Sequence, residues 1–99
     1  MVVVPLDGLQ GPSSGVIELP GRLFWSAPDH TFDLSQRHDA LAAYEAVLTE
    51  ARTPADLAEF LNGELLGAVW GDLHLPDRVR QAWEDAHPAL RAKAHPAAA

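Results

Sequence analysis

The sequence contains no cysteine, so neither a disulfide framework nor a thiolate metal site is open to this chain. Basic residues are also scarce: seven Lys and Arg stand against fourteen Asp and Glu, and the formal net charge is −7. This charge disfavours nonspecific binding to nucleic acids and anionic membranes, and it favours a basic protein partner. No apolar run approaches the roughly 18–20 residues of a membrane span, and MVVVPLDG lacks the basic start of a signal peptide. We therefore expect no membrane association and a cytoplasmic location.

Aromatic residues are few, and they must supply much of the core of a chain of 99 residues. There are three Trp, three Phe and one Tyr, and much of the 47% apolar share is Ala and Leu. This length predicts a small single domain. Such a core rarely gives more than a few kcal/mol of net stability. The Trp residues are therefore expected either in the core or at a protein interface, where Trp is enriched.

The residue pattern predicts a mainly α fold, with about four short helices and a short N-terminal β element. Residues 1–15 are rich in Gly, Ser and Pro, and are expected to be a flexible lead-in. VIELPGRLFWS, at 16–26, is β-branched and aromatic around a Pro-Gly pair. It predicts two short strands or one bent edge strand, to which another chain can add a strand. A loop is expected at 27–34, with Phe32 and Leu34 in the core.

Helix signals follow in four segments. Ser35 is a good N-cap for the first helix, and Thr53-Pro54 is the clearest start signal, for the second helix. Asn62-Gly63 is expected to end the second helix, and Pro88 the last. The predicted helices cover about 36–51, 54–61, 64–70 and 76–87. The helical domain is therefore expected at 16–88, with a flexible tail at 89–99.

The segment from Thr53 to Trp70 has the spacing of a helix-turn-helix, but its charge is wrong for reading DNA. A recognition helix needs Arg or Lys to reach phosphates and base edges, whereas Glu64 is the one charge in its second helix. Five acids and no Lys or Arg lie between Thr53 and Asp77. The segment therefore indicates protein recognition. The alternative is a small DNA-binding transcriptional regulator that uses this helix pair.

No pattern of catalytic, cofactor or metal chemistry stands out in the sequence. The five histidines form no i, i+4 pair, and no serine has the strand-turn-helix context of a nucleophile. We expect no enzyme, no cofactor and no metal site. One basic cluster remains, and it consists of Arg78, Arg80, Arg91 and Lys93. It predicts either a phosphate or operator contact, or cations placed favourably near a helix C-terminus.

Four segments in fixed order carry a family resemblance over about residues 16–90. They are LPGRLFWS, FDLSQRHDALAAYEAVLTEA, TPADLAEFLNGELL and VWGDLHLPDRVRQAWEDAHPAL. The succession resembles a family of short actinobacterial proteins found beside nucleotidyltransferase-like toxins of the AbiEii/MenT type and taken as their antitoxins. The resemblance implies an antitoxin that neutralises a basic, nucleotidyltransferase-like toxin by protein–protein occlusion. The winged-helix DNA-binding domain of larger AbiEi antitoxins has no counterpart here, so the free chain is not expected to bind nucleic acid.

A toxin would be contacted by the aromatic edge segment and by the acidic helix pair. The expected partner-binding residues are Phe24, Trp25, Asp56, Glu59, Glu64, Trp70 and Asp72. A structural adaptor without a toxin partner is a third interpretation of the same features.

Overall fold

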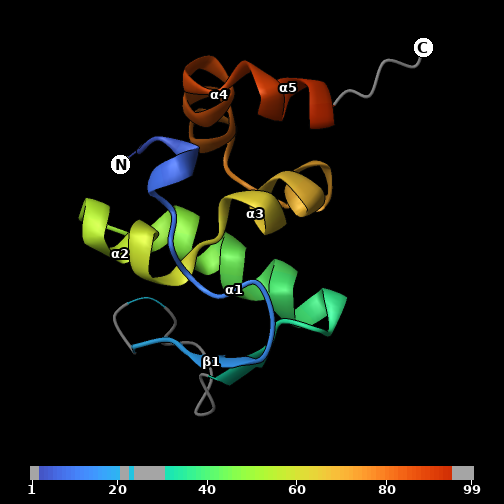
Figure 1. The fold of residues 1–99 in the computed structure, drawn as a ribbon. Helices are drawn as coiled ribbons and strands as arrows, with labels where there is room; N and C mark the ends of the chain where they lie inside the picture. The colour runs from blue at the N-terminus through green and yellow to red at the C-terminus, as the bar shows by residue number, and fades with distance from the viewer. Residues whose placement is uncertain (1–2, 21–22, 24–30, 95–99) are drawn as a thin grey trace.

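A computed structural model describes residues 3–20, 23 and 31–94, and it shows a set of helices with one antiparallel strand pair at one end (Figure 1). The α-helices are α1 (Arg37–Glu50), α2 (Pro54–Phe60), α3 (Gly63–Val69), α4 (Asp77–Ala86) and α5 (Pro88–Ala94). Two 3₁₀ turns, η1 (Leu6–Gly8) and η2 (Trp70–Asp72), and two strands, β1 (Val16–Glu18) and β2 (Thr31–Asp33), complete the order. The predicted mainly α class with a short N-terminal β element is confirmed. No helix in the described ranges is long and apolar enough to span a membrane.

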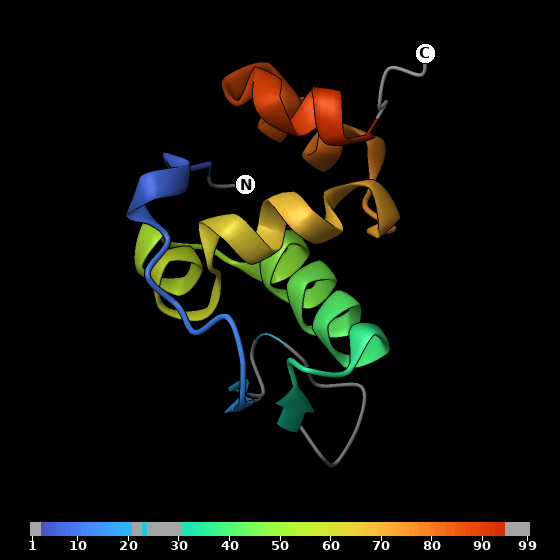
Figure 2. The same ribbon diagram turned by 45° about the vertical axis from the view of Figure 1, so that its right-hand side comes forward.

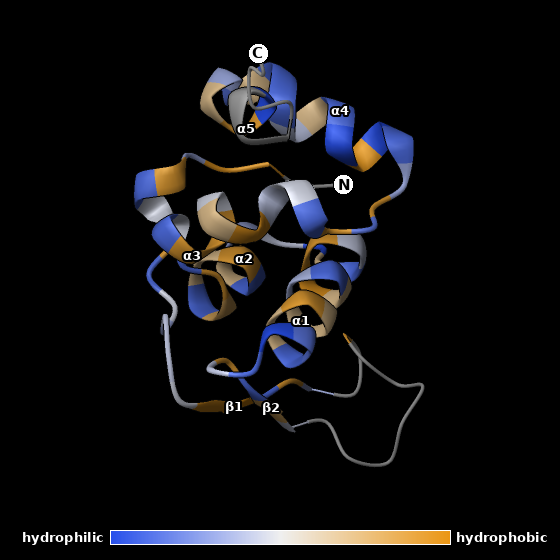
Figure 3. Cartoon of the chain, turned by 90° about the vertical axis from the view of Figure 1, so that its right-hand side faces the viewer, coloured by the Kyte–Doolittle hydropathy of each residue, from blue (hydrophilic) through white to orange (hydrophobic). Residues whose placement is uncertain are grey.

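The molecule measures 41 × 26 × 23 Å. Its elements form three tiers along one direction. The strand pair lies at one end, α1 to α3 form the middle, and α4 with α5 lies at the other end (Figures 1 and 2). The N-terminal segment passes alongside α2 and α3 and so connects all three tiers. Apolar residues concentrate in α1 to α3, whereas α4 is largely hydrophilic (Figure 3).

The strand prediction was half right. β1 lies within the predicted segment, but its antiparallel partner is β2, in residues expected to form a loop. Ile17 faces Phe32 across the pair, and Phe32 is buried while its neighbours in β2 are not. Three residues are too few for strand alternation to stand out in a sequence. Residues 24–30, which include the second half of the predicted segment, lie outside the described residues.

The start of α2 confirms its sequence signal, because Thr53 caps the helix. The Thr53 Oγ1 accepts a hydrogen bond from the Asp56 N–H at 3.3 Å, and Pro54 occupies the first turn. The expected cap of α1 is wrong, since Gln36 takes that position without a side-chain bond. Ser35 instead donates its hydroxyl to Asp33 Oδ1 at 2.6 Å. This bond, with a second from the Ser35 N–H, lowers the pKa of the Asp33 carboxyl.

Asn62 does not end α2 in the expected way but begins α3. Its Oδ1 accepts a hydrogen bond from the Leu65 N–H at 3.1 Å, which is N-cap geometry. Its backbone N–H donates to the Tyr44 hydroxyl at 2.9 Å, and its side-chain amide donates to the Gly11 carbonyl at 3.3 Å. One residue therefore fixes the α2–α3 turn against both α1 and the N-terminal segment.

The N-terminal segment belongs to the folded domain, so the predicted boundary at residue 16 is wrong. Leu9 is buried, and the backbone N–H groups of Gln10 and Gly11 donate to carbonyls of α2 and the residue after it, at 2.9 and 2.8 Å. A Cβ at Gly11 would lie 2.6 Å from the Phe60 carbonyl carbon, so only glycine allows this close approach. Composition suggested mobility, but tertiary contacts hold the segment in place.

The C-terminal boundary at residue 88 is also wrong. Pro88 ends α4 as predicted, yet it also begins α5, where proline is tolerated in the first turn. Leu90 of α5 is 1% exposed and belongs to the core. His87, at the α4–α5 junction, hydrogen-bonds through Nε2 to the Val4 carbonyl at 2.7 Å, so the N-terminal segment contacts this junction.

The core centres on large side chains from different tiers. Trp70, Trp83 and Tyr44 are all fully buried, and so two of the three tryptophans are core residues. Trp25 lies outside the described residues. Burial raises the pKa of the Tyr44 hydroxyl above its ordinary value, while the hydrogen bond from Asn62 opposes the shift.

Candidate functional site

The acidic residues of the α2–α3 pair lie on both sides of the turn that Asn62 fixes. Glu59 is in the last turn of α2 and Glu64 in the first turn of α3, and both are exposed. Neither carboxylate has an ion-pair partner among the described residues. Carboxylates that are solvated and unpaired remain available to cations on another molecule.

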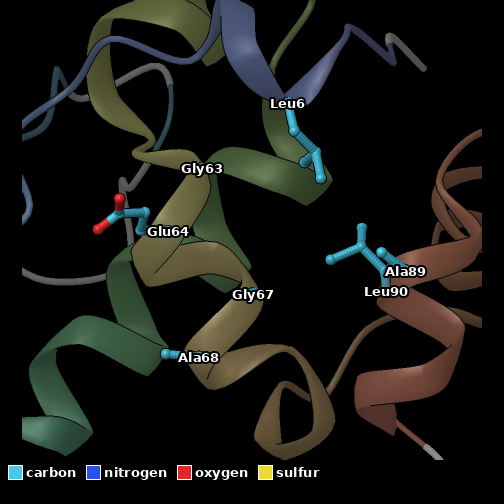
Figure 4. A pocket seen from close by; sticks show the side chains of 7 residues that line it. All are labelled: Leu6, Gly63, Glu64, Gly67, Ala68, Ala89 and Leu90. Atoms are coloured by element: carbon cyan, nitrogen blue, oxygen red, sulfur yellow. The ribbon is translucent and has the colours of Figure 1, made fainter.

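An apolar hollow lies next to Glu64, between η1, α3 and α5 (Figure 4). Its volume is about 330 Å³. Leu6 and Leu90 point into it from opposite sides, whereas Glu64 points away from it. The residues that line it are Leu6, Gly63, Glu64, Gly67, Ala68, Ala89 and Leu90. Apolar walls and an acidic margin resemble the core and rim of a protein interface.

Small residues of α3 create the hollow. Gly63 and Gly67 are one helical turn apart, so they share one face of α3. A Cβ at Gly63 would lie 2.8 Å from the Leu6 carbonyl oxygen, so this glycine is needed for close packing. A Cβ at Gly67 would meet nothing within 4 Å. Gly67 is therefore the position where the hollow can be filled without disturbing the fold.

A buried carboxylate holds the neighbouring helices in place. Glu84 of α4 is 7% exposed, and its Oε2 accepts a hydrogen bond from Trp70 Nε1 at 3.0 Å. Arg80 Nη1 lies 3.6 Å from the same oxygen, and its guanidinium lies 5.0 Å from the centre of the Trp70 ring. Arg91 Nε of α5 lies 3.9 Å from Oε1. This set of contacts joins η2, α4 and α5, and it positions one wall of the hollow.

Sequence reasoning missed Glu84, although one signal was present. Arg80 and Glu84 have the i, i+4 spacing of a helical ion pair. The apolar Ala86 is exposed, whereas the charged Glu84 of the same helix is buried. A glutamate is rarely buried unless it is paired, so a search for apolar periodicity passes over it.

The expected partner-binding residues separate into three groups. Glu59 and Glu64 are exposed on either side of the α2–α3 turn, and Glu64 is one of the residues that line the hollow. Asp72 is exposed but forms an ion pair with Arg37. Asp56 and Trp70 are 4% and 0% exposed, so these two predictions are corrected: neither side chain is open to a partner.

Local contacts account for both corrections. The Asp56 carboxylate turns back toward the chain and accepts a hydrogen bond from the Arg52 N–H at 3.3 Å. Trp70 is held inside by Glu84. The aromatic pair Phe24 and Trp25 lies outside the described residues.

The basic cluster is not a single surface. Arg91 Nη2 contacts Asp85 Oδ1 at 2.8 Å, and Arg80 binds inward to Glu84 and to the Trp70 and Leu73 carbonyls. Arg78 lies in the first turn of α4, so the expected favourable position near a helix C-terminus is wrong for it. Within the described ranges, no group of three or more His, Cys, Asp or Glu residues is arranged to hold a metal ion.

Comparison with protein-family models, with curated proteins and with solved structures gives no match to this chain.

Proposed function

We propose that this chain is an antitoxin, a small acidic protein that binds a basic nucleotidyltransferase-type toxin and blocks it by occlusion. The observation that carries the proposal is the apolar hollow, which has the exposed Glu64 on its margin in a chain of net charge −7. Interfaces bury an apolar centre and surround it with polar contacts, and the binding energy concentrates where a side chain enters a pocket. The resemblance of the sequence motifs supplies the class of partner.

The partner that suits this face has an apolar side chain with Arg or Lys beside it. At about 330 Å³ the hollow is at the small end of the roughly 300–1,000 Å³ of ligand pockets, and it suits an inserted side chain. Glu59 and Glu64 would then meet the flanking cations. A phosphate-binding active-site mouth offers cations of this kind, and the net charge of −7 would steer the two proteins together.

The choice between occlusion and chemical modification rests on stoichiometry. An occluding antitoxin abolishes nucleotidyl transfer at a fixed small molar ratio, because each toxin must be covered. We would titrate this chain against a fixed amount of the proposed nucleotidyltransferase partner and follow the transfer of labelled nucleotide. Complete inhibition far below one equivalent would indicate catalysis by this chain and would overturn the occlusion proposal.

A direct binding test separates the antitoxin from the regulator. The two proteins should co-purify after co-expression, and the free chain should not retard its own promoter DNA at physiological salt. Sequence-dependent DNA binding by the free chain, without a stable complex, would favour the regulator instead.

A further inference from the structure

A second hollow lies where the end of α1 meets the first turn of α4. Its volume is about 430 Å³, and its lining is mainly polar. The polar lining residues are Thr49, Glu50, Arg52 and Arg78. This hollow shares no lining residue with the apolar hollow between α3 and α5, so it requires a separate explanation.

The two arginines of this hollow differ from the other arginines that the structure describes. Arg37 is bound to Asp72, Arg91 to Asp85, and Arg80 to two carbonyls and Glu84. The side chains of Arg52 and Arg78 are exposed, and they have no acceptor among the described residues. In a protein with twice as many acidic as basic residues, two free guanidinium groups therefore line one depression.

The backbone around Arg78 adds to the positive potential. The first bonds of α4 are those from the Val79 and Arg80 N–H groups to the Pro76 carbonyl, so the Asp77 and Arg78 N–H groups precede the helical ladder. The N-terminal end of a helix carries a partial positive charge, and a cation placed there is unfavourable unless an anion compensates it. Arg78 occupies such a position in a helix of ten residues, and Asp77 in the same turn supplies one negative charge there.

We propose that this hollow binds a small phosphate-bearing molecule. The planar guanidinium groups of Arg52 and Arg78 match phosphate oxygens in pairs, and the Thr49 hydroxyl can donate a further hydrogen bond. The Glu50 carboxylate repels the phosphate group of a ligand. It would instead contact the uncharged part of the ligand and accept hydrogen bonds from hydroxyl or N–H groups there. A hollow of about 430 Å³ has room for an organic group beside the phosphate.

The test is a titration with inorganic phosphate and with phenyl phosphate, followed by amide chemical shifts. We expect saturable shifts confined to residues 49–52 and 77–79. Arg52→Gln and Arg78→Gln should each weaken binding about tenfold, since each removes charge-assisted hydrogen bonds. Glu50→Gln should strengthen it, because it removes a like charge.

Arg37→Gln is the control, because it removes another exposed arginine that lies outside the hollow. It should leave phosphate binding unchanged, and circular dichroism should show all four variants folded. Three results would each overturn the proposal: no saturable shift with either phosphate, the same loss of binding in Arg37→Gln, or equal shifts with acetate at matched ionic strength. None of these measurements involves a toxin, so they are independent of the antitoxin proposal.

Discussion

The indole N–H of Trp70 donates a hydrogen bond to the carboxylate of Glu84, and both side chains are buried. The bond joins η2, which follows α3, to the last turn of α4, and Arg91 extends the link to α5. The distance between α3 and α5 sets the width of the apolar hollow, so this internal polar contact also controls the face proposed to bind the partner. A buried carboxylate is stabilising only while its partners remain.

Glu84→Ala should lower the free energy of unfolding by about 1–3 kcal/mol, because it leaves the buried Trp70 N–H without an acceptor. Glu84→Gln should cost less, since the amide oxygen can still accept that bond. Denaturant unfolding followed by tryptophan fluorescence gives both values. Asp85→Ala, which removes an exposed carboxylate paired with Arg91, is the control and should cost no more than about 1 kcal/mol. Equal losses in Glu84→Ala and Asp85→Ala would refute a structural role for the buried carboxylate.

Trp83→Ala should cost about 3–5 kcal/mol, because Trp83 is fully buried in the monomer. Trp83→Phe should cost much less. The buried Trp83 Nε1 has no hydrogen-bond partner among the described residues, so phenylalanine removes an unsatisfied donor along with part of the ring. Chemical denaturation of both variants tests this order. An unchanged stability in Trp83→Ala would place this side chain at an interface instead.

The positions and order of the helices were predictable from local sequence signals, whereas the limits of the folded domain were not. Thr53-Pro54 predicted the start of α2 because a cap and a first-turn proline act within four residues. The N-terminal segment gave no such signal. Gln10 and Gly11 hydrogen-bond to Ala58 and Leu61, which are about fifty residues away along the chain, and a Gly- and Pro-rich composition does not reveal these contacts.

The candidate site was only partly predictable for the same reason. Charge counting located the acidic α2–α3 pair, but it could not separate Glu59 and Glu64 from Asp56, which is buried. The apolar hollow depends on Leu6, Gly67 and Leu90, which three separate elements bring together. Two of these elements lay in segments expected to be flexible, so no reading of local pattern would have predicted the hollow.

Stability should fall in alkali because of Tyr44, the only tyrosine in the sequence. Its folded-state pKa is raised by burial, so the unfolded state loses the phenolic proton first. The stabilisation is therefore complete below the unfolded pKa of about 10, and it is lost as pH rises through the higher folded pKa. Tyrosinate absorbance should show the raised pKa directly.

Tyr44→Phe is the control for this pH dependence. It should flatten the loss of stability above about pH 10. It should also lower stability at neutral pH by about 1 kcal/mol, because the Asn62 N–H loses its acceptor. An alkaline transition that is identical in Tyr44→Phe would assign the effect to other groups.

Gly67→Leu should weaken toxin binding at least tenfold without loss of fold, since it fills the hollow at a position with open space. Replacing a helical glycine also removes backbone entropy from the unfolded chain, so the melting temperature should hold or rise. Ala86→Leu adds a leucine at an exposed position of α4 outside the hollow, and it should bind as the wild type does. Calorimetry with the purified toxin measures both. Undiminished binding by Gly67→Leu would remove the hollow from the interface.

Association with the toxin should slow as salt rises, because opposite charges steer the encounter and salt screens them beyond about 8–10 Å. Reversal of Glu59 and Glu64 to Lys should reduce the association rate at low salt by at least tenfold and should flatten its salt dependence. Both residues are exposed and unpaired among the described residues, so the helical content should not change. Glu50→Lys is the charge control, since it reverses an exposed acid at the end of α1 and outside the apolar hollow. The contrary result is that Glu50→Lys slows association by the same factor, per reversed charge, as the double reversal of Glu59 and Glu64. That result would show that net charge alone steers the encounter and that the face around Glu59 and Glu64 does not.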